Sequence, residues 1–600
     1  MNRFQTDSSV AAPWKVAGPA EGTYSRLKRP GNRRARLQKV AALALLSTAA
    51  GTSLLPAAIF TVGSDGACTH ATITSALVAS LAAGADEIRI ARNQTYTNLY
   101  IHLTDWSPGT VGAVTLAGGY DTCADTTANG TTAIDGQATN PVVEVDTGSQ
   151  PTSQVTLRGL HLTGSGEEGL RIEAGGLVTA SEVLIQGNGT GGVAVVDGGD
   201  LVIDTLSTIS ENTGPGITCL TGAQVDTSAS IFDNLATAGG GIVAGSTCDM
   251  NILNNSAISA NNATLGGGIY ASSGATVLVD GAVASVYATE IAGNTATDQG
   301  GGIYATGATT TVLIRNTVVT GNEAGLEGGG IWAGLGAKVI MDRVDGPCFN
   351  PTRCSDLSGN GVTQVDISVP GAAVFAESGA DVEIYQTIAE GNYLTPGLNN
   401  GSILYATGVG STLTVEGMRL WNNQEADALF EGRDSAHLSI AFVTASRNVW
   451  NGGFTTSPVA LIVGATATLN SSIFHPNDAM VLDSGGELTE ADCLILSNTT
   501  GLPVDATLIS TSDPMFANAI AGNLRPLPSS PAVDYCDTFA YTPLHFDGDH
   551  EARGFDLASN PNGTPGASGG LYDLGFDEVR PLFADGFFSG NTSAWSSVAP

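Results

Sequence analysis

The chain repeats a short pattern of glycine and aliphatic positions. Three glycines followed by an isoleucine occur at 239–242, 266–269, 300–303 and 328–331, and looser copies flank them. Taking the aliphatic residue as a phase mark gives the series Val193, Ile217, Ile242, Ile269, Ile303, Ile331, Val374, Leu404 and Leu429. Regular intervals of this size indicate a repeat architecture. We interpret the longest interval, which contains Cys348 and Cys354, as an insertion.

Short β-branched stretches lie between these marks, for example at 201–203, 277–279 and 312–314. Such stretches, bounded by bends, predict short strands. One repeat is too small to bury its own apolar face, whereas coils stacked on one another would bury it and pair every backbone edge. The pattern therefore predicts an all-β solenoid of about a dozen coils, a rod on the order of 60 Å long at about 4.8 Å per coil.

An asparagine precedes each phase mark. Asparagine tolerates the left-handed backbone conformation that a sharp bend needs, and asparagines stacked in register can pair amide to amide. The series is Asn188, Asn212, Asn234, Asn261, Asn294, Asn322, Asn360, Asn392 and Asn423.

The repeats are preceded by a predicted capping helix. Ile73, Leu77 and Leu81 recur at helical spacing, and Thr72 is placed to cap the helix. We divide the chain into a basic leader with a signal peptide (1–58), an N-terminal cap and first coil (59–130), the repeats (131–510), final coils and a C-terminal cap (511–580), and a tail motif (581–600).

These motifs resemble a known group, the right-handed parallel β-helix (pectin-lyase-like) exported bacterial proteins with polymorphic-outer-membrane-protein-type repeats. The resemblance covers roughly residues 60–580 and rests mainly on the phrase Asn … Gly-Gly-Gly-Ile-Tyr-Ala. The resemblance implies a right-handed solenoid. It also implies a fold shared with pectate lyases, polygalacturonases and epimerases.

The number and distribution of charged residues bear on the partners and the location of the protein. The chain has 23 basic and 57 acidic residues, a net charge of −34, which argues against nucleic-acid binding. Nine of the basic residues lie in 1–39, ahead of an apolar run that begins at Val40. This order is typical of a secretory signal peptide, cleaved between Ser47 and Ile59, with a membrane anchor as the alternative. The rest of the chain carries a charge near −41 and one lysine, Lys338.

Eight cysteines in a chain expected to be exported favour disulfides over free thiols or zinc. The nearest pairs along the chain are Cys68 with Cys123, Cys219 with Cys248, Cys348 with Cys354, and Cys493 with Cys536.

The residue after each phase mark is predicted to face outward, because strand side chains alternate. In six consecutive coils this residue is aromatic: Tyr270, Tyr304, Trp332, Phe375, Tyr405 and Phe430. An exposed aromatic column of this kind would suit the binding of glycan rings. The alternative is a self-stacking ladder that stabilises the sheet, with or without a loop that covers it.

Catalytic motifs of the related enzymes are missing from the sequence. Arg315 and Asp342-Arg343 fall on strands in successive coils, and Lys338 begins a strand. We interpret Arg315, Asp342 and Arg343 as solvated surface pairs rather than catalytic groups. His475-Pro-Asn-Asp478 matches an epimerase pattern only in composition.

The C-terminal acidic cluster of Asp547, Asp549, Glu551 and Asp556 has the hard oxygen ligands that calcium prefers. The alternative is an end-cap network in which Arg553 pairs with Asp573 or Glu578. Beyond this calcium site we expect no cofactor.

We therefore expect a secreted or surface-associated, non-enzymatic, monomeric rod that is adhesive, structural or glycan-binding, with no transmembrane domain in the mature chain. The alternative is a polysaccharide lyase or glycoside hydrolase with an atypical site. Carboxylates beside the aromatic column, together with Arg315 or Arg343, would favour that alternative.

Overall fold

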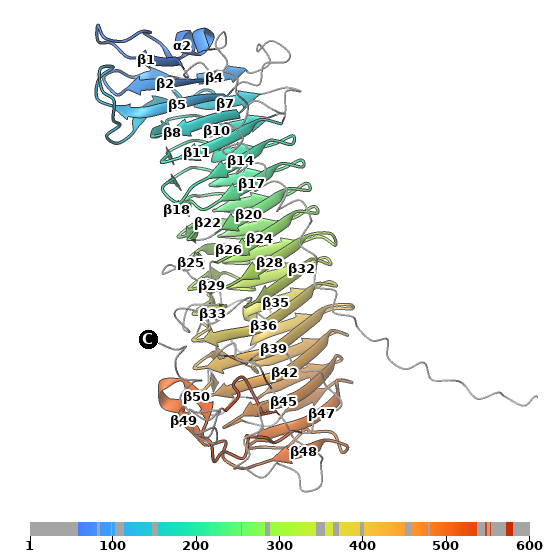
Figure 1. The fold of residues 1–600 in the computed structure, drawn as a ribbon. Helices are drawn as coiled ribbons and strands as arrows, with labels where there is room; N and C mark the ends of the chain where they lie inside the picture. The colour runs from blue at the N-terminus through green and yellow to red at the C-terminus, as the bar shows by residue number, and fades with distance from the viewer. Residues whose placement is uncertain are drawn as a thin grey trace, which may run out of the picture. The chain divides into compact units, whose positions relative to one another are not determined.

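The architecture is that of parallel strands stacked coil upon coil. The computed structural model describes residues 58–80, 85–97, 99–102, 113–146, 154–173, 175–253, 255–281, 289–343, 355–363, 371–395, 401–425, 427–450, 458–477, 480–536, 547–548, 553 and 572–579. The leader and the tail motif lie outside these residues. Figure 1 shows the coils following one another from β1 to β48. The predicted all-β solenoid is confirmed for the described part of the chain.

Each coil contributes strands to up to three sheets. Sheet B has 14 described strands: β4 Leu99–His102, β7 Val143–Asp146, β10 Glu168–Glu173, β13 Gly191–Val195, β16 Ile217–Cys219, β19 Ile242–Ala244, β23 Ile269–Ala271, β27 Ile303–Thr306, β31 Ile331–Gly334, β35 Gly371–Glu377, β38 Ser402–Thr407, β41 Phe430–Arg433, β44 Ala460–Val463 and β46 Val481–Asp483. Sheet C has seven: β22 Asn262–Leu265, β26 Thr295–Gln299, β30 Glu323–Ala324, β34 Gly361–Val362, β37 Tyr393–Leu394, β40 Gln424–Glu425 and β43 Val449–Trp450.

Sheet A is the largest, with 27 described strands, and it bends in the middle of each coil. Its first half holds β1 Ala58–Val62, β2 Ala85–Ala91, β5 Ala113–Tyr120, β8 Gln154–Arg158, β11 Leu177–Ser181, β14 Asp200–Ile203, β17 Gln224–Thr227, β20 Asp249–Leu253, β24 Thr276–Asp280, β28 Thr311–Arg315 and β32 Lys338–Asp342. Its second half holds β3 Tyr96–Thr97, β6 Thr132–Asp135, β9 Leu160–Thr163, β12 Leu184–Gln186, β15 Thr208–Ser210, β18 Ser230–Phe232, β21 Ala257–Ser259, β25 Thr289–Ala292, β29 Thr317–Thr320 and β33 Asp356–Ser358. In later coils the two halves form one bent strand: β36 Asp381–Glu390, β39 Thr412–Trp421, β42 His437–Ser446, β45 Thr466–Phe474 and β47 Glu487–Leu496, followed by β48 Thr507–Ser510.

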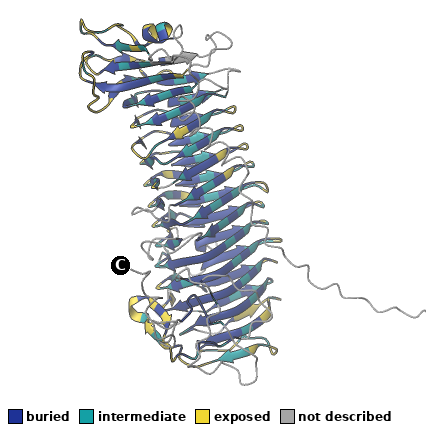
Figure 2. Ribbon diagram, in the orientation of Figure 1, coloured by how far each residue is buried: buried dark blue, intermediate teal, exposed yellow. Residues whose placement is uncertain are grey.

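The core runs inside the coils. The inward positions are aliphatic and almost fully buried, as at Ile242, Ile269, Ile303 and Ile331. Figure 2 shows buried strands and exposed turns along the stack. Removal of this apolar surface from water is the main stabilising contribution.

The asparagines form a buried hydrogen-bonded ladder. In each step the Nδ2 of one asparagine donates to the Oδ1 of the next, for example from Asn261 to Asn294 at 3.0 Å. The ladder continues one coil beyond the predicted series, to Asn448. The left-handed bend lies at the preceding residue, as at Gly293 with φ of 62°. Of the two predicted roles, amide pairing is therefore the one observed.

The glycine triplets allow neighbouring coils to approach closely. Gly266 has a left-handed backbone with φ of 64°, which favours glycine. A Cβ at Gly267 would lie 2.6 Å from the carbonyl oxygen of Gly301 in the next coil. The triplet is therefore a packing requirement of the bend between sheets C and B.

Both ends of the described stack carry extra elements. The helix α2 (Ile73–Ser80) covers the first strands, and the Thr72 hydroxyl accepts a hydrogen bond from Ser75 N at 3.1 Å, as the sequence predicts. Beyond β48, a hairpin consists of β49 Phe516–Asn518, a 3-10 helix η2 Ala519–Ala521, and β50 Asn523–Pro526.

Candidate functional site

Five of the six predicted aromatic residues lie in register on sheet B. Tyr270, Tyr304, Trp332, Phe375 and Tyr405 occupy matching positions on β23, β27, β31, β35 and β38. We call these five residues the aromatic ladder. The repeat places them there because each follows the inward aliphatic residue and precedes an inward alanine.

The rings of the aromatic ladder stack in two groups, Tyr270 to Trp332 and Phe375 with Tyr405. The ring centroids of Tyr304 and Trp332 are 4.1 Å apart with an interplanar angle of 1°, and those of Tyr270 and Tyr304 are 5.1 Å apart at 5°. Phe375 and Tyr405 stack at 4.9 Å and 7°. Parallel strands bring identical positions close together, so the ring faces mainly contact other rings.

The exposure of the aromatic ladder differs from the expectation. Trp332, Phe375 and Tyr405 are only 3–4% exposed, whereas Tyr270 and Tyr304 are half-buried. Burial also raises the pKa of the Tyr304 hydroxyl to about 12. Only the end of the ladder nearest the N-terminus therefore meets solvent.

Phe430 does not belong to the column, which corrects the sequence prediction. It pairs in register with Leu404, points inward and is fully buried, with its ring centroid 6.3 Å from that of Phe474. The phase mark of this coil is therefore Phe430 rather than Leu429. A one-residue shift moves every side chain of a strand to the other face.

Glu431 occupies the column position beside Tyr405. Its side chain is buried, accepts a hydrogen bond from Ser402 Oγ at 2.7 Å, and pairs with Arg433. Burial raises the pKa of the Glu431 carboxyl, and Ser402 and Arg433 oppose that shift. A charged pair thus ends the aromatic ladder.

Two carboxyl groups flank the aromatic ladder, and sequence reasoning missed both. Glu327 Oε2 accepts hydrogen bonds from Gln299 Nε2 at 2.6 Å and from Trp332 Nε1 at 3.3 Å. Burial raises the pKa of the Glu327 and Glu377 carboxyls, and the charge of Glu327 adds to the shift of Glu377. Their positions in the repeat could have indicated both residues. Glu327 directly precedes a glycine triplet, and Glu377 follows Phe375 by two residues.

The basic residues that the sequence singled out lie on sheet A or beside it. Arg315 pairs in register with Asp342. Arg343 is buried and donates to the carbonyl oxygen of Gly548. Lys338 Nζ lies 2.5 Å from both Asp381 Oδ2 and Glu383 Oε1. The structure therefore does not bring these residues together with the aromatic ladder.

His475 and the C-terminal carboxylates are only partly described. Burial lowers the pKa of the His475 imidazole, and Asp478 lies outside the described residues. Asp547 is buried, and its Oδ2 accepts from Glu578 N at 3.3 Å. The other three predicted calcium ligands, Asp549, Glu551 and Asp556, also lie outside the described residues.

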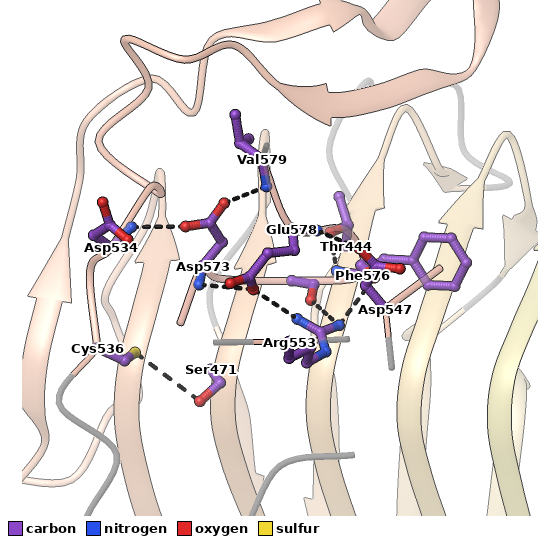
Figure 3. A network of polar contacts seen from close by, with 11 residues as sticks. Thr444, Ser471, Asp534, Cys536, Asp547, Arg553, Asp573, Phe576, Glu578 and Val579 are labelled. Atoms are coloured by element: carbon purple, nitrogen blue, oxygen red, sulfur yellow. Dashed lines mark hydrogen bonds and ion pairs between the residues drawn. The ribbon is translucent and has the colours of Figure 1, made fainter. Parts of the chain in front are cut away.

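The alternative network around Arg553 is present, although it lies against the side of sheet A (Figure 3). Arg553 donates to the carbonyl oxygens of Gly575 and Phe576 at 2.9 Å, and its Nη1 lies 3.9 Å from Glu578 Oε2. Its guanidinium carbon also sits 4.4 Å from the ring centroid of Phe442. These contacts fix the C-terminal segment to the coils.

Disulfides join three of the four predicted cysteine pairs: Cys68–Cys123, Cys219–Cys248 and Cys493–Cys536. The first ties the N-terminal cap, the second links adjacent coils, and the third anchors the C-terminal segment to β47. Cys348 and Cys354 lie outside the described residues.

The handedness of the coils comes from comparison with known proteins. Residues 141–284 match the family model of the right-handed β-helix region. The fold is a right-handed parallel β-helix. No curated protein matches the chain of this β-helix. Within its described residues, none of the helices has the length and apolar character needed to span a bilayer.

Proposed function

We propose that this β-helix is an exported, non-enzymatic protein that serves as a structural or adhesive scaffold and contacts glycans at the exposed end of the aromatic ladder. Export is supported by the disulfides, which persist in oxidising compartments. The scaffold role is supported by the continuous asparagine ladder and by the stacked rings of the aromatic ladder. The adhesive role rests on one observation, the partial exposure of Tyr270 and Tyr304 beside polar groups.

Glycan contact would use ring edges and hydrogen bonds, because the ring faces are occupied by stacking. Tyr270 and Tyr304 present partly exposed hydroxyl-bearing rings. Gln299, at the end of β26, is hydrogen-bonded to Glu327, which flanks the aromatic ladder. A few placed polar groups beside aromatic surface are typical of small-ligand sites. The net charge of −34 favours neutral sugars over anionic ones.

A glycan array with the purified protein tests this proposal. Tyr270→Ala removes the outermost ring, so we expect binding to fall about tenfold, the effect of roughly 1.4 kcal/mol of lost contact. Thr218→Ala is the matched control, because Thr218 occupies the same column two coils earlier. Equal binding by both variants and the wild type would contradict glycan contact at this position.

A second candidate function is cleavage of a polysaccharide. The observation that favours it is the pair Glu327 and Glu377, two carboxyls with raised pKa values beside aromatic rings. Raised carboxyl pKa values suit a general acid near neutral pH. The arginine that this alternative required is not beside them.

Incubation with neutral and acidic polysaccharides, followed by assays for new reducing ends and unsaturated products, tests the enzymatic alternative. If Glu327 acts as an acid, Glu327→Gln should lower the rate at least a hundredfold. Thr407→Ala, at the register position next to Glu377, is the control. We expect no turnover from the wild-type protein; turnover that Glu327→Gln abolishes would replace the non-enzymatic proposal.

A further inference from the structure

A tryptophan on the flank of sheet A lies under the C-terminal hairpin of residues 516–526. Trp421, the last residue of β39, donates from Nε1 to the carbonyl oxygen of Ala519 at 2.9 Å. A Cβ at Gly522 would lie 3.3 Å from the Trp421 ring, and Gly522 has a left-handed φ of 76°. The backbone of the hairpin at Ala519 and Gly522 therefore lies against the indole of Trp421.

Charged groups surround this tryptophan in the adjacent coils. Glu390 pairs in register with Trp421, and its Oε2 lies 3.6 Å from Arg419 Nη2. Asp356 occupies the same column as Arg419, two coils earlier. Its neighbour Ser358 accepts a hydrogen bond from Glu390 N at 3.0 Å, which links the two carboxyl-bearing strands.

Charges of the C-terminal segment act on this group, which is itself partly buried. Burial raises the pKa of the Asp356 carboxyl to about 6, and burial also lowers the pKa of the Arg419 guanidinium. Asp577 of the same segment acts on Arg419 and pairs with Arg525 of the hairpin at 2.7 Å. Asp356 and Arg419 are thus partly withdrawn from water, whereas the side chain of Glu390 is 41% exposed.

The hairpin is anchored at its base and exposed at its tip: Leu524 is 4% exposed, and Phe516 packs against the buried cluster that includes Ile473 and Ile495. Most residues of β49 and η2 are exposed, and Ile520 is 75% exposed. Its contacts with the coils include the Trp421 hydrogen bond and the packing of β50 against β42. The exposed tip that contacts Trp421 should therefore open at a lower free-energy cost than the buried base.

We propose that Trp421, Glu390, Arg419 and Asp356 form a second carbohydrate-binding site, which the hairpin closes in this structure. An indole beside carboxylate and guanidinium groups offers one apolar face and several hydrogen-bonding groups, the combination that a sugar ring requires. Two carboxyls in a chain of net charge −34 favour a neutral oligosaccharide. This site lies on sheet A, so it does not depend on the aromatic ladder.

A shortened hairpin tests the proposal. Replacing residues 519–522 with Asn-Gly, a dipeptide suited to a two-residue hairpin turn, removes the backbone that covers Trp421. Titration with xylohexaose, maltohexaose and cellohexaose, followed by tryptophan fluorescence and calorimetry, should show binding of at least one of them. We expect binding about tenfold tighter than in the wild type, because the open state is no longer a minor population.

Two further variants make the outcome decisive. Trp421→Ala in the shortened protein should abolish binding, whereas Thr414→Ala, on the other half of β39, should leave it unchanged. Absence of binding by a folded shortened protein, or equal binding after Trp421→Ala, would overturn the proposal. If the shortened protein fails to fold, the Arg525→Ala variant replaces it, because this substitution removes the ion pair with Asp577. We expect the oligosaccharide affinity of Arg525→Ala to be two- to fivefold higher than that of the wild type. Absence of this gain would also overturn the proposal. Tyr270→Ala should have no effect here, which separates this site from the proposed glycan contact on sheet B.

Discussion

At the scale of single residues, the asparagine ladder carries much of the order between coils. Asn261 donates from its backbone and its Nδ2 to Asn294 Oδ1, and from Nδ2 to the carbonyl oxygen of Ile231. Its Oδ1 accepts from the backbone and the Nδ2 of Asn234. Unsatisfied buried groups of this kind cost about 1–3 kcal/mol each.

Asn261→Ala should therefore destabilise the protein by about 3 kcal/mol, because the buried backbone N–H of Asn234 loses its acceptor and the Oδ1 of Asn294 loses two donors. The adjacent Asn262→Ala is the control, since Asn262 is exposed, and it should cost less than about 0.5 kcal/mol. Guanidinium denaturation of both variants measures the difference. Similar midpoints would mean that the ladder contributes little.

At the scale of elements, the sequence predicts the register of sheet B correctly as far as Tyr405 and incorrectly at Phe430. Glycine triplets fix the phase from Ile242 to Ile331, because three glycines fit only one bend. The coil at 428–432 has no triplet, and both Leu429 and Phe430 are buried, so hydrophobicity alone gives two choices. The contacts of Glu431 with Ser402 and Arg433 distinguish them, and these depend on the adjacent coil.

The members of the aromatic ladder should contribute unequally to the free energy of unfolding. Trp332→Ala removes a ring that is 3% exposed and stacked on Tyr304, so a loss of about 3 kcal/mol is expected. Trp332→Phe keeps a ring and should cost about 1 kcal/mol. Denaturation midpoints rank these variants; equal losses would show that ring stacking is not what stabilises this strand.

At the scale of the whole described molecule, the C-terminal segment runs back along the side of sheet A. The contact of Arg343 with Gly548 joins residues 205 positions apart. The sequence predicts the partners inside this segment, such as Arg553 with Glu578, since they are close along the chain. It does not predict the face on which the segment lies, because that depends on long-range contacts such as Phe576 N with Thr444 Oγ1 at 2.8 Å.

Attachment of this segment should depend on pH. Burial, with the nearby Glu578 charge, raises the pKa of Asp573 to about 8, so folding favours the protonated carboxyl. Stability is then lost as pH rises from the unfolded value near 4 through 8. Between pH 5 and 8 we expect the wild type to lose about 2 kcal/mol more than Asp573→Asn, which cannot ionise.

Urea denaturation at several pH values measures this difference, with limited proteolysis to locate the loosened part. Asp483→Asn is the control, because Asp483 is exposed on β46 and should follow the wild type. Parallel pH profiles for the wild type and Asp573→Asn would show that Asp573 does not govern attachment.

The asparagine ladder also has a direction. From Asn188 to Asn423, each asparagine donates to the asparagine of the following coil. A coil that has just joined the stack thus presents two unused donors, and one side-chain oxygen of the incoming coil satisfies both. The newest coil is in this sense a template for its successor. A chain that emerges N-terminus first can fold in the order in which it appears, each turn completing the hydrogen bonds of the turn before it.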